Sequence, residues 1–102
     1  MHKVMYLVRR QDNVSPEEFR QNYRDHAKLV QQLPSVEHYH MNFPTAEAEA
    51  PYDAIVEVWV RDAGAFEQEM SGSAGQAVLD HGSTFVRMGE VVSISVDVEE
   101  AW

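Results

Sequence analysis

Apolar residues recur along this chain with two different spacings. In residues 53–60, DAIVEVWV, every second position is Ala or Val, which is the period of a β-strand with one buried face. Shorter apolar or alternating runs predict three further strands, at residues 3–9, 35–43 and 91–98. Between these runs the apolar spacing lengthens to three or four residues, which is typical of helices.

A helix is predicted over about residues 15–32, with signals for both of its ends. Ser15 is a favourable N-cap, Pro16 fits the first turn, and Glu18 stands three residues after the cap, as in a capping box. One face then carries the apolar stripe Phe19, Tyr23, Ala27 and Val30. The helix should end before Pro34, because a residue that precedes proline disfavours the helical region.

Two shorter helices are predicted in the second half of the chain. Asp62 is expected to cap the first, which carries Phe66 and Met70, and a second is expected over about 74–81, after the break SGSAG. The elements then follow the order β-α-β-β-α-β, the ferredoxin-like α+β pattern of a four-stranded antiparallel sheet with helices on one face. No linker or repeat divides this order, so residues 1–102 are expected to form a single domain.

The sheet face that the helices leave open indicates how the protein assembles. In residues 53–60 this face presents Ile55 and Trp59 beside Glu57, which is too apolar to meet water freely. In residues 35–43 alternation assigns to it Val36, His38, His40 and Asn42. We therefore expect two copies to associate through their open sheet faces, as a homodimer that closes a barrel around a cavity.

Charge and composition remove several classes of partner and cofactor. The chain has 17 acidic and 8 basic residues, a net charge of −9, so it repels nucleic acid and anionic membranes. It has no cysteine, which excludes disulfides and thiolate chemistry, and it has no signal-peptide pattern, so a cytoplasmic location is expected. No glycine-rich phosphate loop is present, and no organic cofactor or functional metal is expected.

Four segments, spread over nearly the whole chain, carry a resemblance to a known family. They are YLVRRQDNVSPEEFRQNYRDH, LPSVEHYHMN, YDAIVEVWV and SGSAGQAVLDHGSTFV. In order and spacing they resemble the EthD family of the dimeric α+β barrel superfamily. The family's HxPL motif corresponds to His26-Ala27-Lys28-Leu29, where lysine replaces the proline and allows the helix to run on further than in relatives.

This resemblance implies a homodimer with a small cavity in each subunit and no tightly bound organic cofactor, but it does not select a reaction. The family is named for a protein encoded beside a cytochrome P450 system for ethyl tert-butyl ether breakdown. Similar domains include fungal dehydratases that act on polyketide-derived aromatics. More distant relatives with the same barrel include cofactor-free monooxygenases, cyclases and muconolactone isomerases.

His26 is the first candidate catalytic residue, because it lies on the apolar stripe of its helix and is the motif histidine of the family. A neutral imidazole suits proton transfer near neutral pH. The alternative is a core histidine that is hydrogen-bonded to the backbone. Tyr23 lies beside it on the stripe, and His81 and Phe85, which follow the last short helix, are further candidates for the cavity wall.

His38, His40 and Glu57 form the second candidate group. If residues 44–51 make a simple hairpin loop, His38 faces Glu57 and His40 faces Ile55, and a carboxylate beside a histidine is a common acid/base arrangement. The alternative is a polar group at the dimer interface without catalysis. With Ile55 and Trp59 lining the barrel cavity nearby, we expect a small apolar or aromatic ligand there.

Three classes of function are consistent with these residues. The first is a cofactor-free acid/base enzyme on a small apolar or aromatic oxygenated metabolite, of oxygenase, isomerase or dehydratase type. The second is a non-catalytic ligand-binding module that supports a partner oxidoreductase. The third is a structural dimer whose barrel is filled. A cavity with histidines favours the first class, a purely apolar cavity the second, and a cavity too small for a ligand the third.

Overall fold

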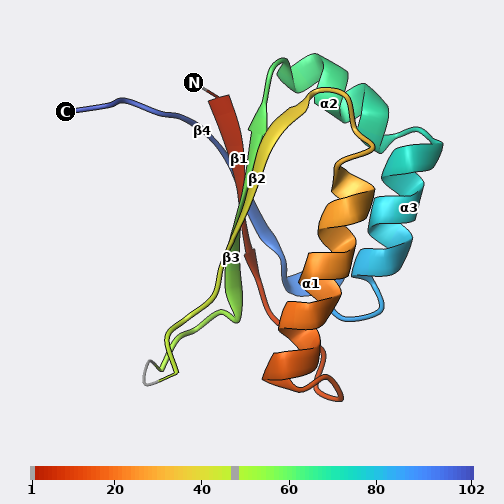
Figure 1. Cartoon of the computed structure of the whole chain (residues 1–102), viewed down its shortest axis with the longest axis vertical. Helices are drawn as coiled ribbons and strands as arrows, with labels where there is room; N and C mark the ends of the chain where they lie inside the picture. The colour runs from red at the N-terminus through yellow and green to blue at the C-terminus, as the bar shows by residue number, and fades with distance from the viewer. Residues whose placement is uncertain (1, 47–48) are drawn as a thin grey trace.

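The computed structural model describes residues 2–46 and 49–102, and Figure 1 shows its elements in the predicted order. The strands are β1 (His2–Val8), β2 (Val36–Asn42), β3 (Ala54–Val60) and β4 (Val92–Asp97). The helices are α1 (Pro16–Val30), α2 (Ala63–Met70) and α3 (Ser73–Gly82), followed by one 3-10 turn, η1 (Met88–Glu90). Of the predicted loop 44–51, Glu47 and Ala48 lie outside the described residues.

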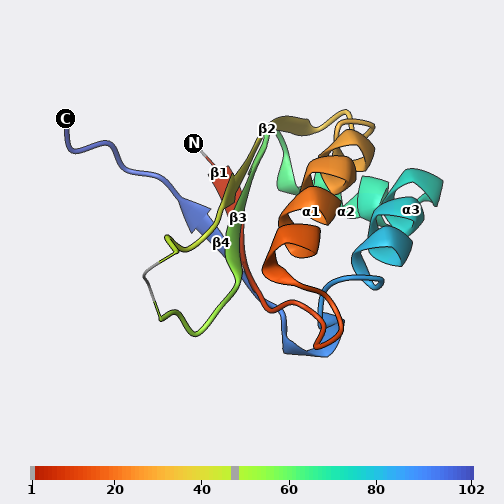
Figure 2. The same ribbon diagram turned by 60° about the horizontal axis from the view of Figure 1, so that its bottom comes forward.

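The four strands form one antiparallel sheet in the order β2-β3-β1-β4, and the helices lie on one face of it (Figures 1 and 2). This arrangement confirms the predicted ferredoxin-like α+β fold. Helices α1 and α3 lie side by side, and no described helix covers the opposite face of the sheet (Figure 2). None of the described helices has the length and apolar character that a membrane span requires.

The start of α1 is set by the predicted cap. The backbone N–H of Glu18 donates a hydrogen bond of 3.1 Å to the Ser15 hydroxyl, and Pro16 is the first helical residue. The helix ends at Val30, so the predicted boundary at residue 32 is two residues too far. Its buried face consists of Phe19, Tyr23, His26 and Val30. Helix α1 therefore carries His26 directly over the sheet.

The core lies between the helices and the covered face of the sheet. The inward residues of β3 are only 1–3% exposed, as their alternation predicts: Ala54, Val56, Val58 and Val60. They pack with inward residues of β1 and with buried aromatic rings, among them Val8, Phe19 and Phe85. Full burial of such side chains is worth about 1.5–3 kcal/mol each, so this layer dominates the stability of the fold.

Val36 does not share the open face with the two histidines of β2, contrary to the alternation. A register shift between Val36 and His38 places Val36 opposite Val60, on the helix-covered side, where it packs against the core. An extra residue in one strand turns every later side chain to the other face, which simple alternation cannot anticipate.

The pairing of β2 with β3 also differs from the predicted register. His38 pairs with Trp59 and His40 pairs with Glu57, whereas the simple hairpin assigned His38 to Glu57 and His40 to Ile55. The two strands separate earlier than expected, so the connecting loop is longer. Because the displacement is an even number of residues, His38 and His40 still share a face with Glu57 and Trp59.

Two contacts fix α2 and α3 at one end of the sheet. Gly75 approaches the backbone of Met70 so closely that a Cβ atom there would overlap it. The Glu69 carboxylate accepts hydrogen bonds of 2.8–3.1 Å from the backbone N–H and the hydroxyl of Ser35, which is fully buried. The end of α2 is therefore tied to the start of β2, and this tie holds Phe66 and Met70 over the sheet.

Candidate functional site

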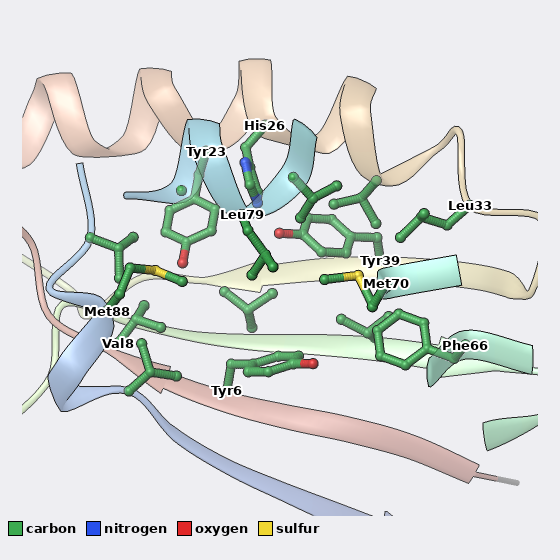
Figure 3. Close-up of a pocket in the computed structure, with 17 residues that line it drawn as sticks. Tyr6, Val8, Tyr23, His26, Leu33, Tyr39, Phe66, Met70, Leu79 and Met88 are labelled. Carbon is green, nitrogen blue, oxygen red and sulfur yellow. The ribbon is translucent and has the colours of Figure 1, made fainter. Parts of the chain in front are cut away.

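A cavity of about 140 Å³ lies between the helices and the covered face of the sheet (Figure 3). The strands form its floor, α1 and α3 form its roof, and α2 and η1 close its two ends. Of the residues labelled in the figure, the floor contributes Tyr6, Val8 and Tyr39, the roof contributes Tyr23, His26 and Leu79, and the ends contribute Leu33, Phe66, Met70 and Met88. No residue that lines the described cavity carries a formal charge at neutral pH.

His26 is paired with a second histidine beside this cavity. Its Nδ1 atom lies 2.9 Å from Nδ1 of His81, and the two rings are nearly parallel, with centroids 5.1 Å apart and planes at 22°. One facing nitrogen must carry the hydrogen and the other must accept it, so the two rings hold opposite tautomers. His26 is 8% exposed and His81 is half-buried, so the pair leads from the cavity toward the surface.

The protonation state of His26 follows from this environment. Burial, and to a lesser extent the charge of His81, lower the pKa of His26 to about 4, so its imidazole is neutral at pH 7. Figure 3 shows the ring pointing from α1 into the cavity. The rings of Tyr23 and Phe85 pack edge-on against it at 5.7 and 5.5 Å between centroids, which holds its orientation.

Three phenol groups supply the other polar side-chain atoms of the cavity. Tyr6, Tyr23 and Tyr39 all line it, and across residues 2–46 and 49–102 no hydrogen bond joins their hydroxyls to another protein group. Burial raises the pKa of each phenol, and for Tyr39 the nearby phenols of Tyr23 and Tyr6 add to the rise. The hydroxyls therefore keep their protons and are available as hydrogen-bond donors.

Sequence reasoning missed part of this site. Tyr6 and Tyr39 were not among the predicted site residues, and His81 was predicted only for the cavity wall, although Tyr6 and His81 each carry a detectable signal. Tyr6 stands two residues from both Val4 and Val8, the buried residues of β1, so it shares their inward face and its hydroxyl lies inside the fold. His81 follows Val78, an inward residue of α3, by three positions and so shares its face.

The predicted cavity-lining set divides between two places. Tyr23 lines the helix-side cavity, but Ile55 and Trp59 lie on the opposite face of the sheet and cannot reach it. Phe85 is completely buried in the core behind the cavity, and His81 stands behind His26 rather than on the wall. Of the predicted cavity-lining residues, only Tyr23 therefore lines the helix-side cavity.

The open face holds the second predicted group in a different arrangement. Glu57 lies 3.5 Å from Lys3 Nζ and 3.9 Å from His40 Nδ1, which is too far for a hydrogen bond to the histidine. Lys3 Nζ also stands 4.5 Å from the centre of the Trp59 ring, and His40 packs on that ring. His38 contacts the same indole edge-on. Lysine, not histidine, is the close partner of this carboxylate.

Metal ligation finds no support in the described parts of the chain. Among residues 2–46 and 49–102, no three histidine, aspartate or glutamate side chains come together in an arrangement that could hold an ion. His26 and His81 meet each other through Nδ1. Proton transfer and hydrogen bonding are the chemistry that these side chains support.

The fold and this cavity define a class: small ferredoxin-like α+β proteins whose helices enclose a ligand-sized space against the sheet. The model of the EthD domain family matches residues 11–89, and the chain belongs to that family. This match confirms the resemblance carried by the four sequence segments. A search of curated protein sequences found no match.

Solved structures support the fold. The chain is similar to HapK from Hahella chejuensis, with a TM-score of 0.80 and 19% identity over 100% of this chain and 96% of that one. It is also similar to an EthD family protein from Bacillus halodurans C-125, with a TM-score of 0.75 and 16% identity over 97% and 100%. A dimeric ferredoxin-like protein from Thermobifida fusca YX matches with a TM-score of 0.74 and 18% identity over 95% and 90%.

Proposed function

We propose that this EthD-family protein is an enzyme that moves a proton to or from a small apolar or aromatic oxygenated compound in the helix-side cavity, with His26 as the catalytic acid/base. The observation that carries the proposal is the contact between His26 and His81. It joins a buried, neutral imidazole at the cavity to a more exposed one by a 2.9 Å Nδ1–Nδ1 contact. General acid/base catalysis of this kind contributes about 10²–10⁴-fold to a rate.

His81 is proposed as a positioning residue that also receives charge. When Nε2 of His26 takes a proton from the ligand, the hydrogen on its Nδ1 passes to Nδ1 of His81. His26 thereby stays neutral, the ligand is left as an anion, and the positive charge resides on His81, nearer to water. Return of the proton along the same path to another ligand atom completes an isomerisation, or an elimination if a hydroxyl leaves as water. No external oxidant or cofactor is needed for these steps.

The tyrosines complete this mechanism. Proton removal next to a carbonyl develops negative charge on its oxygen, and phenol donors in a dry cavity stabilise that charge strongly. Tyr23 is beside His26 on α1, and its hydroxyl points toward the sheet in Figure 3. We assign Tyr23 and Tyr39 this role, with Tyr6 as the third donor of the cavity.

Deuterium exchange tests proton transfer without knowledge of the natural substrate. Cyclohexanone is incubated with the protein in D₂O, and loss of its α-hydrogen signal is followed by proton NMR. We expect exchange above the buffer rate, at least about tenfold slower in His26→Asn, a loss of roughly 1.4 kcal/mol of transition-state stabilisation. His81→Asn should also slow exchange, whereas the open-face control His40→Asn should not. Equal exchange in the native protein and His26→Asn would contradict the proposal.

A second candidate, a non-catalytic ligand-binding module for a partner oxidoreductase, is favoured by the uncharged, mainly apolar lining of the cavity. The same experiment separates the two. A module binds cyclohexanone but leaves its α-hydrogens in place, and His26→Asn then changes neither property.

We further propose that the protein is a homodimer formed through the open sheet face. Structural relatives include a dimeric ferredoxin-like protein. The pairing of the strands puts an apolar row on this face, namely Met5, Leu7, Ile55, Val92 and Ile94. Ile94 is 50% exposed in the single chain, which is unfavourable for a large aliphatic side chain unless a partner covers it. His38, His40 and Glu57 would then lie at the dimer interface rather than in a catalytic centre.

A further inference from the structure

We infer that the helix-side cavity binds an uncharged compound with a single six-membered ring, whose oxygen accepts hydrogen bonds from the tyrosine hydroxyls. This inference deepens the proposed function and rests on the same cavity. Three independent features carry it: the volume of the cavity, the kind of polar atoms in its wall, and the absence of charged side chains from its lining.

The volume sets the number of rings. The cavity measures about 140 Å³, close to an engineered protein cavity of about 150 Å³ that binds benzene. Aromatic and thioether side chains close both ends, Phe66 and Met70 on one side and Met88 on the other, as Figure 3 shows. Since α2 is tied to β2 through Glu69 and Ser35, one of these ends is held in place. One six-membered ring therefore fills this space, and a second fused ring would have to project out of the cavity or displace the helices.

The tyrosines set the polarity of the ligand. Tyr6, Tyr23 and Tyr39 line the cavity, and a ligand that fills it takes their hydroxyls out of contact with water, so each donor then needs an acceptor on the ligand. Because the phenols of Tyr23 and Tyr39 keep their protons, they present hydrogens rather than negative oxygens to a ligand. The complementary group is an acceptor such as a ketone or quinone oxygen, which the hydroxyls can satisfy while the ring contacts Val56 and Val58.

The lining also excludes anionic ligands. It contains no lysine or arginine, and His26, its one basic group, is neutral at pH 7. A carboxylate or phosphate transferred from water into such a space would be left without a countercharge, which is strongly unfavourable. The net charge of −9 opposes the approach of an anion as well.

Three matched ligands test the inference by protein NMR titration at pH 7: cyclohexanone, cyclohexanecarboxylate and 2-decalone. They share a saturated six-membered ring and differ in charge or ring number. We expect saturable shifts at cavity residues with cyclohexanone, and binding at least tenfold weaker for the other two. Equal or tighter binding of 2-decalone would overturn the single-ring assignment. Equal binding of the carboxylate would overturn the uncharged one.

Tyrosine variants test the hydrogen-bond donors. Tyr39→Phe and Tyr23→Phe remove one hydroxyl each and keep the ring, and each should weaken cyclohexanone binding by about two- to tenfold. Tyr52→Phe is the matched control, because Tyr52 does not line this cavity, and it should bind like the native protein. If one variant does not fold, Tyr6→Phe replaces it. Unchanged binding in all the folded cavity variants would refute the proposed recognition of the ligand oxygen.

The outcomes also separate this inference from the proposed function. If cyclohexanone binds with the expected preference but exchange does not depend on His26, the ligand class stands and the acid/base function fails. If exchange depends on His26 but 2-decalone is preferred, the acid/base function stands and the ligand class fails.

Discussion

The protein's own helices cover one face of the sheet and leave the other open, and the histidines on the two faces differ in burial and hydration as a result. On the covered face, the protein's own helices bury His26 and lower its pKa to about 4. On the open face, the side chain of His40 is 62% exposed and stands near a carboxylate that already pairs with Lys3. In the single chain, the same residue type is thus a dry, neutral hydrogen-bonding group on one side and a hydrated surface group on the other. Position relative to the helices, not residue type, decides which histidine suits buried proton transfer.

The largest expected effect contrasts a covered and an open position of β3. Val58→Asp buries a carboxylate under the helices and should lower the free energy of unfolding by at least about 3 kcal/mol at every protein concentration. Ile55→Asp points to the open face, so it should destabilise only where the native protein is dimeric. Urea denaturation at several concentrations checks both. If both variants lose a similar free energy of unfolding at the lowest protein concentration, the two faces do not differ as proposed.

The second prediction concerns pH and His26. Its pKa is lowered from 6.5 to about 4 in the folded protein, so between these values only the unfolded chain binds the proton. The contribution of neutral His26 to the free energy of unfolding is therefore fully present above pH 6.5. It is lost as the pH falls from 6.5 to 4, and the total loss is about 3 kcal/mol. His26→Asn should flatten the measured fall over this range, and His40→Asn should leave it unchanged. An equally steep fall in His26→Asn would show that another group causes it.

The third prediction tests how the open face is closed. Ile94→Glu places a charge in the apolar row and should raise the dimer dissociation constant at least about 100-fold, or roughly 2.7 kcal/mol. Ser95→Glu adds the same charge to the neighbouring residue of β4, whose side chain points to the other face, and should remain dimeric. Light scattering at tens of micromolar measures both. A monomeric native protein under these conditions would contradict the homodimer itself.

The smallest expected effect is that of the ion pair on the open face. The side chains of Lys3 and Glu57 are 16% and 20% exposed in the single chain, so their attraction is offset in part by lost hydration. Lys3→Met keeps the aliphatic stem over Trp59 and should change monomer stability by less than about 1 kcal/mol. Thermal unfolding of dilute protein measures the change. A loss of stability as large as that of Val58→Asp would mean that the Lys3–Glu57 ion pair is a main source of monomer stability.

Local patterns were sufficient to predict most of the fold. Ser15, Pro16 and Glu18 determine where α1 begins through contacts within four residues, and strict alternation identifies the buried face of β3. The bulge after Val36 and the length of the β2–β3 loop depend on contacts between strands, so the register was displaced. Neither feature has a signal in the residues themselves. The side of the sheet that His38 and His40 occupy was nevertheless predicted correctly, because the register is displaced by an even number of residues.

The candidate site was predictable only in part, for the same reason. The position of His26 on a helical stripe was sufficient to place it inside the fold. Its contact with His81 requires α1 and α3 to lie side by side, a distance of 55 residues along the chain. The cavity itself arises from the volumes of side chains from seven elements, which no sequence period expresses.

The facing Nδ1 atoms of His26 and His81 have a consequence for spectroscopy. A single hydrogen lies between two nitrogens of the same kind, so the two imidazoles form an unequal pair at any instant. In a ¹⁵N-histidine-labelled sample, each ring should display one pyrrole-like and one pyridine-like resonance while the hydrogen stays in place, with the assignment inverted between the two residues. The two tautomers interchange only if the Nδ1 hydrogen crosses and, at the same time, one Nε2 gains a proton while the other loses one. Rapid interchange of this kind would merge these signals toward averaged shifts. The line shape therefore reports the rate of hydrogen exchange between the two rings in the resting protein, before any ligand enters the cavity.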